Sequence, residues 1–380
     1  MSQMNWDREV DVLVVGTGNG GLTAAVCNWE MGTKDVLIIE KQDKVGGTSA
    51  TSGGGIWIPN SHYAKEAGAE DNPQDARAYL MNTLFGEDVP EEMIDIYLEK
   101  SPEMLKFLHD RTDVRYESLA EYPDYYTNME GARAGHRSLE PAPIMASELG
   151  ENWKNMTWTH FMMRMFNRIH FTQVEAHLLM VQLPGWKKLL ARLMWDYIRD
   201  IPWRLKTPIS RRLACGSAGV ARLYLSVLKR EIPLEFNTQM VELIAEGDTV
   251  LGAVIECNGQ RQRVRAAKGV IVASGGFEKN QALRERYLPA PTNTDWSAGN
   301  PANEGDALLA GLELGAKTRL MNDAWWTTTL CVPDEPAPLP AILEKSFPGS
   351  LVVTRDGQRS AHASPHHMPL HTALRQRPHH

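Results

Sequence analysis

The chain has 380 residues, 43% of them hydrophobic and 23% charged, which suffices for one large or two ordinary domains around a buried core. Its formal net charge of −7 gives no general reason to expect nucleic-acid binding. The four cysteines form no CxxC pair, so we expect reduced thiols in a cytoplasmic protein, with neither a disulfide framework nor a metal site. No apolar run approaches the roughly 20 residues of a membrane-spanning helix, and the first residues lack the apolar segment of a secretory signal.

Residues 11–32, DVLVVGTGNGGLTAAVCNWEMG, contain a glycine-rich turn between two expected elements. The apolar run 12–15 predicts a buried strand, and residues 22–31 predict a helix. Gly16, Gly18 and Gly21 complete the pattern G-x-G-x-x-G between them. The first glycine permits a tight turn, the second lets the backbone approach a pyrophosphate, and the third lets the helix pack on the strand. The helix N-terminus then offers unpaired N–H groups and a positive dipole end to phosphates.

A second expected strand, DVLIIE at residues 35–40, ends at Glu40 and is followed by Lys41. Glu40 lies 24 positions after Gly16 (40 − 16), where a carboxylate can accept hydrogen bonds from the ribose of a dinucleotide. A glycine turn without a ligand is the alternative. The acidic residue at the end of the next strand, together with the strand–turn–helix context, favours a dinucleotide site.

Residues 44–59, KVGGTSATSGGGIWIP, form a second glycine cluster. Their glycines and hydroxyl side chains expose hydrogen-bond donors at close range, which suits an extended cofactor with a second phosphate and a large flat ring. A flexible surface loop is the alternative, but the apolar residues 56–59 follow at once, and such a run favours burial. The sequence therefore favours FAD over NAD.

A third glycine element, GVIVASGGFEKN, starts with an expected strand at residues 270–273. Before it, residues 240–246, 249–256 and 262–266 are separated by turns and predict an antiparallel meander. These strands complete the sheet that opens the chain. We therefore predict an α/β fold, in which a Rossmann-like domain with a parallel sheet plus an antiparallel β-meander carries an inserted α+β catalytic domain.

Four stretches together resemble the FAD-dependent fumarate reductase/succinate dehydrogenase flavoprotein superfamily: VVGTGNGGLTAA, EKQDKVGGTSATSGGGIWIP, VIVASGGFEKN and AGNPANEGDALLAGLELGA. PDYY at residues 123–126, NDAWWTT and PGSLVVTRDGQR favour the branch of 3-ketosteroid (3-oxosteroid) 1-dehydrogenases, which desaturate the steroid A ring. The resemblance spans about residues 8–359. It implies an oxidoreductase that acts on CH–CH groups of a lipophilic, steroid-like substrate and passes electrons to an external acceptor.

The resemblance also implies a division of the chain. The FAD-binding domain would comprise residues 1–100 and 213–280, and the catalytic domain residues 101–212 and 281–359. The succinate dehydrogenase branch attaches FAD to a histidine near the first glycine loop; GGTSATSGG has none, so we expect noncovalent FAD. The residues assigned to FAD are Gly16, Gly18, Gly21, Glu40, Lys41, Gly47, Thr48, Ser49, Gly53, Gly54, Gly55, Gly275, Gly276, Asn303, Gly305 and Asp306.

Desaturation beside a ketone requires a base for the α-proton, a donor to the carbonyl oxygen, and flavin N5 as hydride acceptor. The resembling enzymes use tyrosines for the first two tasks. Tyr125 in YPDYY is the first candidate, and Tyr126 is the second. A packed aromatic turn without a catalytic role is the alternative.

Two other functions compete with this one. A reductase of small unsaturated acids would need an arginine acid after RDGQR, and none follows in a matching motif. His136 and Arg137 could bind an anion, although we expect an ordinary surface turn there. A non-catalytic remnant is the third possibility, because the tyrosine and the Tyr-Pro-Gly-x-Gly stretch of the resembling enzymes are absent after Arg359.

Residues 160–212 form a basic, tryptophan-containing insert with ten Lys/Arg and three Asp/Glu, a net charge of +7 (10 − 3). Leu189, Leu190, Leu193, Met194 and Tyr197 would share one helical face. We expect a helical lid whose apolar face packs on the protein. A lid that contacts the membrane surface and admits a lipophilic substrate is the sharper alternative.

Residues 360–380 differ in composition from everything before them, with six of the twelve histidines and no acidic residue. The family pattern should continue after Arg359 with Phe and an Asn-Glu pair, but Ser360 and Ala361 stand there. We interpret the segment as an aberrant tail, the product of a frameshift or truncation. A histidine-rich metal-binding tail is the alternative.

Overall fold

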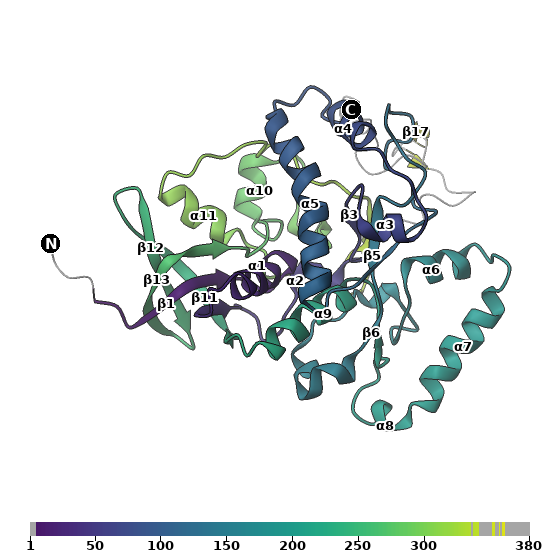
Figure 1. Cartoon of the computed structure of the whole chain (residues 1–380), viewed down its shortest axis with the longest axis horizontal. Coiled ribbons are helices and arrows are strands. Elements are labelled where there is room, and N and C mark those ends of the chain that lie inside the picture. The colour runs from purple at the N-terminus through teal and green to yellow at the C-terminus, as the bar shows by residue number, and fades with distance from the viewer. Residues whose placement is uncertain (1–4, 336, 342–351, 354–356, 358, 362–380) are drawn as a thin grey trace.

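The structure is a computed structural model that describes residues 5–335, 337–341, 352–353, 357 and 359–361 (Figure 1). The predicted tail 360–380 lies outside the described residues from residue 362 onward. Only the backbone of residues 360 and 361 is described, as the end of a short strand.

One six-stranded sheet organises the chain, in the order β10-β2-β1-β13-β12-β11. Its first four strands are mutually parallel, and β13, β12 and β11 form the antiparallel meander. This arrangement confirms the predicted α/β fold. The bounds are β1 (Arg8–Val15), β2 (Val36–Ile39), β10 (Leu234–Glu235), β11 (Thr238–Glu246), β12 (Thr249–Cys257) and β13 (Gln260–Val272).

The sequence divides β13 wrongly into two strands, at residues 262–266 and 270–273. The structure has one strand of 13 residues that changes partners along its length. It pairs with β12 from Gln260 to Arg265 and, in parallel, with β1 from Val264 to Val272. Gly269, with φ at +146°, permits the irregular backbone between the halves. The break in the apolar pattern therefore marks a change of neighbour rather than a loop.

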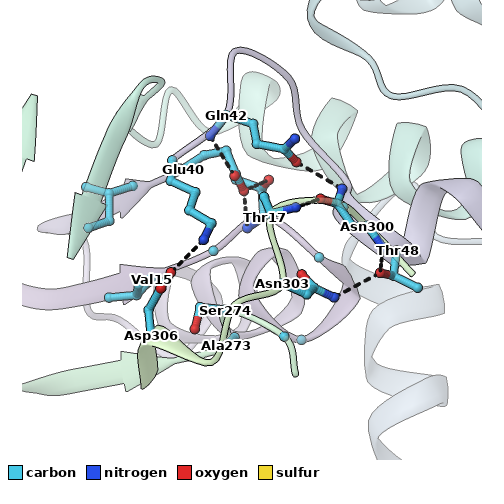
Figure 2. A pocket seen from close by; sticks show the side chains of 18 of the residues that line it. Val15, Thr17, Glu40, Gln42, Thr48, Ala273, Ser274, Asn300, Asn303 and Asp306 are labelled. Atoms are coloured by element: carbon cyan, nitrogen blue, oxygen red, sulfur yellow. Dashed lines mark hydrogen bonds and ion pairs between the residues drawn. The ribbon is translucent and has the colours of Figure 1, made fainter. Parts of the chain in front are cut away.

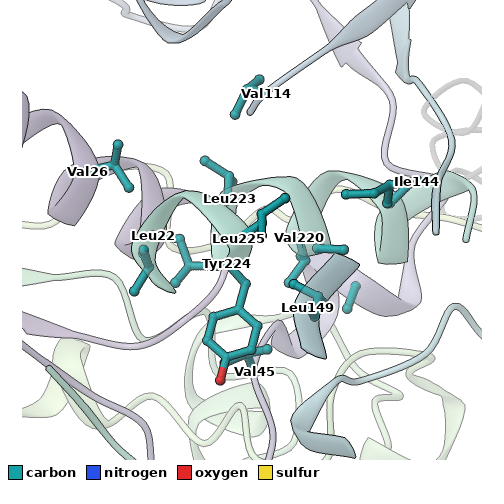
Figure 3. Packing of buried hydrophobic residues seen from close by; sticks show 14 of the residues in the cluster. Leu22, Val26, Val45, Val114, Ile144, Leu149, Val220, Leu223, Tyr224 and Leu225 are labelled. Atoms are coloured by element: carbon teal, nitrogen blue, oxygen red, sulfur yellow. The ribbon is translucent and has the colours of Figure 1, made fainter. Parts of the chain in front are cut away.

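The main core lies between this sheet and two helices, α1 (Asn19–Glu30) and α9 (Cys215–Lys229). Figure 3 shows Leu22 and Val26 of α1 near Val220, Leu223 and Tyr224 of α9. The whole first half of α9 is buried, which suits its run of small residues and glycines. These two helices fix the glycine-rich ends of the neighbouring strands in place.

Residues 47–118 lead from the sheet into the inserted domain. Figure 1 shows the long helix α5 (Glu91–Arg111) crossing the middle of the molecule, with α3 and α4 beyond it. The predicted boundary at residues 100 and 101 falls inside α5. The remaining elements here are α2 (Gly47–Thr51), β3 (Ile56–Trp57), α3 (His62–Glu66), α4 (Pro73–Asn82) and β4 (Tyr116–Ser118).

The inserted domain continues with short strands and three helices that lie at the end of the molecule away from the sheet (Figure 1). Leu189 and Leu193 of α7 pack on Ile169, with Met194 and Tyr197 at the edge of this small cluster. The expected packing of the lid helix on the protein is confirmed. The bounds are β5 (Ser138–Pro141), β6 (Ile144–Met145), the 3₁₀ helices η1 (Ala146–Asn155) and η2 (Phe161–Met163), β7 (Arg164–Met165), β8 (Ile169–His170), α6 (Gln173–Met180), α7 (Trp186–Arg199), α8 (Ile201–Arg204) and β9 (Arg212–Leu213).

After the sheet, the chain returns along it with α10 and α11, which Figure 1 shows above β12 and β13. Helix α11 packs against β11. The bounds are α10 (Gln281–Tyr287), the 3₁₀ helix η3 (Thr294–Trp296), α11 (Asp306–Glu313), β14 (Thr329–Leu330), β15 (Leu339–Pro340), β16 (Val352–Val353) and β17 (Arg359–Ala361). Within the described residues, no helix is both long and apolar enough to cross a bilayer.

Candidate functional site: a dinucleotide cavity beside a tyrosine loop

A cavity of about 320 Å³ lies at the carboxyl ends of β1, β2 and β13. Parallel sheets bind ligands at this edge, where strand order changes and helix N-termini converge. Figure 2 shows side chains from four separate segments meeting there. Ten predicted cofactor residues line the cavity: Gly16, Gly18, Glu40, Lys41, Gly47, Thr48, Ser49, Gly275, Asn303 and Asp306.

The first glycine loop has the geometry that its sequence predicts. Gly16 has φ at +100°, and a Cβ there would lie 2.5 Å from the carbonyl oxygen of Ala273. A Cβ on Gly21 would lie 2.0 Å from the carbonyl oxygen of Gly16. These two glycines therefore let β1, α1 and β13 approach one another. Gly18 caps α1 without any side-chain hydrogen bond, so the N–H groups of the first turn face the cavity edge.

Glu40 is held rigidly at the end of β2. It is 8% exposed, and its carboxylate accepts hydrogen bonds from the backbone N–H of Thr17 at 3.1 Å and of Gln42 at 3.0 Å. The hydroxyl of Thr17 donates a third bond to the same oxygen as its own N–H. A carboxylate has about four lone-pair positions. One position thus remains for a ribose hydroxyl, which is the task that the sequence assigns to Glu40.

The second glycine cluster meets a distant segment at Thr48. The Thr48 hydroxyl accepts from the backbone N–H of Asn300 at 3.1 Å and from the side-chain amide of Asn303 at 3.0 Å. Asn303 also donates to Glu278 at 2.7 Å. Figure 2 shows Thr48 between Asn300 and Asn303 on one side of the cavity. Residues 300–303 therefore close the cavity over the loop that starts at residue 47.

Lys41 and Asp306 form an ion pair at the rim, with Nζ 2.8 Å from the carboxylate. The Lys41 side chain is 18% exposed, and Glu304 adds a second contact at 3.3 Å. The pair joins the end of β2 to the first residue of α11 (Figure 2). Residues that the sequence assigns to one cofactor from distant positions thus stand in direct contact.

The cavity fits the ADP portion of FAD by its chemistry. Two buried polar atoms that line it, Asn19 Oδ1 and Ser274 Oγ, have no hydrogen-bond partner among the described residues. Buried polar atoms in proteins are almost always hydrogen-bonded, so both are suited to a polar ligand. The glycine cradle, the helix N-terminus and the acidic group at the ribose position point to a dinucleotide.

Six predicted residues do not line the cavity. Gly21 lies behind the first loop, and Gly54, with φ at +72°, lies against the backbone of Cys215. Gly53 receives a hydrogen bond on its carbonyl from the Gln173 amide at 3.2 Å, and this contact ties the loop to α6. Gly276 approaches Glu278 and Gly305 caps α11, while Gly55 lies beside Gln173. Their assignment to FAD stays a prediction.

The sequence missed several residues that line the cavity. Its far wall comes from the start of β11, at Thr238, Gln239 and Met240. No local pattern marks them, because they reach the cavity only through the parallel pairing of β10 with β2, which brings the start of β11 to the same edge of the sheet. Thr17 and Asn300 were also missed; their roles depend on hydrogen bonds between distant segments.

Residues 122–126, here called the tyrosine loop, are anchored to the second glycine cluster through Trp57. This residue lies in β3 near the end of the cluster, and its indole N–H donates to Asp124 at 2.7 Å. Asp124, 2% exposed, also accepts from Arg137 Nη1 at 2.8 Å. Arg137 in turn holds Asp71 with two hydrogen bonds, at 3.0 Å from Nε and 2.9 Å from Nη2.

The expectation of a surface turn at Arg137 is wrong. Arg137 is 1% exposed and its charge is balanced by two carboxylates, so it is a structural ion pair rather than a free anion site. Burial alone would raise the pKa of Asp71, but the hydrogen bonds and charge of Arg137 outweigh it and hold that pKa below its ordinary value. His136 is partly exposed and contacts Ser118 through Nδ1 at 3.0 Å.

Tyr125 and Tyr126 lie in the loop that this ion pair fixes. Both are partly buried. Burial, followed by the charge of Tyr125 and a side-chain hydrogen bond with it, raises the pKa of Tyr122. Burial, followed by the charge of Asp323, raises the pKa of Tyr126. The Tyr126 ring packs on Phe85, with centroids 5.0 Å apart. The surroundings of Tyr126 therefore favour its neutral form, which suits a hydrogen-bond donor more than a base.

Comparison with known proteins places these features in a family. The FAD binding domain family matches residues 11–373, which is most of the chain. The chain belongs to this FAD-binding family. The match continues past Arg359, where the sequence pattern departs from that of the resembling enzymes. Membership confirms the predicted cofactor, FAD.

Three similar proteins are informative. The 3-oxosteroid 1-dehydrogenase of Mycobacterium tuberculosis is 35% identical over 363 residues, covering 93% of this chain and 62% of the relative. The 4-oxocyclohexanecarboxylate 2-dehydrogenase of Sinomonas cyclohexanicum is 31% identical, covering 96% and 60%. The 3-ketosteroid delta1-dehydrogenase of Sterolibacterium denitrificans, solved with 1,4-androstadiene-3,17-dione, superposes with a TM-score of 0.92 at 37% identity, covering 97% and 66%. The chain thus spans under two thirds of each protein that it resembles.

Proposed function

We propose that the chain is an FAD-dependent dehydrogenase that introduces a double bond beside a ring ketone, most closely the 1,2-desaturation of 3-ketosteroids. The observation that carries the proposal is the pairing of an FAD cavity with a tyrosine loop anchored to its second glycine cluster. The similar proteins support it, because two of the three named above are steroid dehydrogenases and the third acts on a cyclic keto acid.

The residues that would hold FAD fall into two groups. Gly16, Gly18, Glu40 and the N-terminus of α1 would bind the ADP portion, and Thr48 with Asn303 would bind further along. When bound, FAD supplies the electron-accepting part of the desaturation. No histidine stands in residues 46–54, so the attachment would be noncovalent.

Within this proposal Tyr125 handles the proton. It would take the α-proton of the ketone or donate to the carbonyl oxygen, and Tyr126 would serve if Tyr125 does not. The Trp57–Asp124 bond holds the loop against the residues that follow the second glycine cluster, so the tyrosines have a fixed position. A mobile loop would position the tyrosine hydroxyl less accurately and slow the reaction, because catalysis depends on a reacting group held near its target.

Tyr125→Phe tests the role directly, because it removes only the hydroxyl. In flavin-loaded protein we expect turnover of a 3-ketosteroid to fall by roughly 10²–10⁴-fold, with steroid binding little changed. Tyr122→Phe, which removes the hydrogen-bonding neighbour of Tyr125, is the matched control and should cost far less. Equal turnover in Tyr125→Phe and the unmodified chain would remove Tyr125 from the site.

The fumarate-reductase-like alternative has less support. A flavin-loaded chain of that kind would oxidise its reduced flavin with fumarate. Arg137 is the one fully buried arginine beside the tyrosine loop among the described residues. Its two neighbouring carboxylates already neutralise its charge. Arg137 therefore offers a dicarboxylate no free charge.

We also propose that the protein is cytoplasmic and contacts the membrane surface through residues 160–212. On α7 and α8, the face opposite Leu189 and Leu193 exposes Trp195 (62%), Ile198 (48%) and Ile201 (59%), followed by Leu205 (84%). Basic side chains flank this face, within a segment of net charge +7 (10 − 3). Exposed apolar residues beside basic ones are typical of helices that lie in a membrane interface.

Co-sedimentation with liposomes containing anionic lipid tests the membrane contact. The chain should pellet with such liposomes, and the double variant Trp195→Glu/Ile198→Glu should stay in the supernatant. Met31→Glu changes an equally exposed apolar residue at the end of α1 and should pellet normally. Pelleting that does not depend on lipid would end this part of the proposal.

A further inference from the structure

Arg164 is a shielded cation in the inserted domain. It opens β7, and the register of the hairpin places it directly opposite His170 of β8. Its Nε and Nη1 atoms are buried, and no residue that the structure describes forms a hydrogen bond with them. Desolvation lowers the pKa of this guanidinium. Proteins rarely bury a charge without a counter-charge, so such a group indicates a site for an anion.

The insert itself offers no counter-charge to Arg164. Residues 160–212 contain three acidic side chains, and each pairs with a different arginine. Glu175 holds Arg212 at 2.9 Å and Arg192 at 2.8 Å. The other two pairs are Asp196 with Arg199, and Asp200 with Arg211.

His170 adds a second polar group, and its tautomer follows from its neighbours. His170 is 2% exposed. The Ser210 hydroxyl donates to the carbonyl of Arg212 at 2.9 Å, so it must accept from His170 Nδ1, which lies 3.1 Å away. The proton of the neutral ring therefore sits on Nδ1, and the buried Nε2 carries a lone pair without a partner among the described residues. Nε2 can accept a hydrogen bond from a protonated carboxyl group.

His160 supplies the opposite arrangement. Its Nδ1 accepts from the backbone N–H of Met162 at 3.4 Å, so the proton of the neutral ring sits on Nε2. That buried N–H also has no partner in the described part of the chain. Burial, and then the charge of Arg164, lower the pKa of both imidazoles, and the charge of Glu335 partly opposes the shift at His160.

The cluster adjoins the second glycine loop. The backbone N–H of His160 donates to the carbonyl of Thr51 at 3.1 Å. Met163, next to Arg164 in sequence, lies against Gly53, with its terminal methyl 3.8 Å from the position of a Cβ there. A ligand bound at Arg164 would therefore sit beside the loop that the sequence assigns to the flavin.

We propose that Arg164, with His160 and His170, forms a carboxylate-binding subsite of the substrate site, so that ring ketones bearing a carboxylate belong to the substrate class of this chain. The guanidinium carries Nε and Nη1 on different edges, so each can donate a separate charge-assisted hydrogen bond to a bound anion. His160 Nε2–H adds a donor, and His170 Nε2 accepts a hydrogen bond from the carboxyl group when the ligand is protonated. The inference rests on the proposed function only for the statement that the ligand is a substrate.

Binding of a minimal pair of probes tests the subsite without turnover. Cyclohexanecarboxylate and its neutral isostere cyclohexanecarboxamide would be titrated into the full chain by calorimetry and by tryptophan fluorescence. The Trp158 ring lies 6.3 Å from that of His170, so its emission should respond. We expect the carboxylate to bind at least about tenfold more tightly than the amide, as charge-assisted hydrogen bonds allow.

Variants locate the preference. Arg164→Met should abolish it, and Arg164→Lys, which keeps the charge but loses the planar guanidinium donors, should weaken it. Arg168→Met changes an exposed arginine in the same hairpin and should leave it intact. Equal affinity for the two probes in the unmodified chain would overturn the proposal, and so would a preference that survives in Arg164→Met.

Two further outcomes distinguish the carboxylate subsite from an ion pair within the chain and from the proposed function. If Arg164→Met lowers the melting temperature while neither probe binds the unmodified chain, the carboxylate comes from the chain itself and the subsite proposal fails. If the carboxylate binds as expected but no 3-ketosteroid or keto acid bleaches bound flavin, the subsite stands and the proposed function fails.

Discussion

Arg137→Met should strongly destabilise the protein, because it leaves the buried Asp124 carboxylate without a counter-charge and leaves Asp71 with only Arg133, at 3.6 Å. Arg137 is 1% exposed and binds Asp71 twice and Asp124 once, at 2.8–3.0 Å. Removing one partner of a buried ion pair costs about 3–5 kcal/mol. An entropy of unfolding of about 2.1 cal/mol/K per residue gives about 0.8 kcal/mol per kelvin for 380 residues. The melting temperature should therefore fall by about 4–6 °C, as measured by calorimetry.

Arg133→Met is the matched control in the same loop. Arg133 pairs with Asp75 at 2.8 Å, but both side chains are about 40% exposed, at 38% and 41%. Such surface pairs contribute about 0–1 kcal/mol. The difference between the variants should shrink below about pH 4, because Asp71 contributes stability above its unfolded pKa of about 3.9 and loses it as the pH falls through its lower folded pKa. Equal destabilisation by both substitutions would refute the reasoning.

Three more predictions follow from individual residues. Gly21→Ala places a Cβ 2.0 Å from the Gly16 carbonyl, so it should destabilise the protein by about 1–3 kcal/mol and remove most of the bound FAD, as read from the visible spectrum. In the control Gly311→Ala the nearest neighbour is 3.5 Å away, and neither effect is expected. Retained FAD in Gly21→Ala would contradict the packing argument. Burial, aided by the charges of Arg164 and Arg212, lowers the pKa of His170 to about 3. Protonation of this residue in the unfolded chain should therefore lower the unfolding free energy by about 1.4 kcal/mol per pH unit below pH 6.5. In urea titrations, His170→Gln should remove about 2 kcal/mol of the decrease between pH 6.5 and pH 5. Cys215, whose pKa burial raises to about 12, should resist a thiol reagent at pH 8 that labels exposed Cys331 within minutes; rapid labelling of both would show that α9 opens.

Much of the fold could be predicted because its signals are local. The spacing of Gly16, Gly18 and Gly21 records close approaches that only glycine allows, and the structure shows the two shortest at 2.5 and 2.0 Å. The apolar run of β1 and the turns of the meander likewise depend on neighbouring residues. The family and its cofactor follow from these stretches together.

The sequence-based predictions that failed concern contacts between residues far apart in the chain. Arg137 resembles a turn residue in its sequence context, but its partner Asp71 lies 66 residues away. The apolar pattern differs between the two ends of β13 because their neighbouring strands differ, and the sequence of one strand does not reveal its neighbours. Arg164 gave no signal at all, since a buried and an exposed arginine look alike in a basic segment. The FAD and catalytic assignments that do not line the cavity stay predictions.

The visible spectrum of the purified chain, followed by anaerobic addition of a 3-ketosteroid, tests the central claim most directly. The account predicts a flavin spectrum that bleaches as the steroid is added and recovers when an electron acceptor is supplied. Bound flavin that does not respond to any ring ketone would contradict the proposed dehydrogenase activity. A colourless protein would contradict the assignment of the glycine-lined cavity to FAD in this chain.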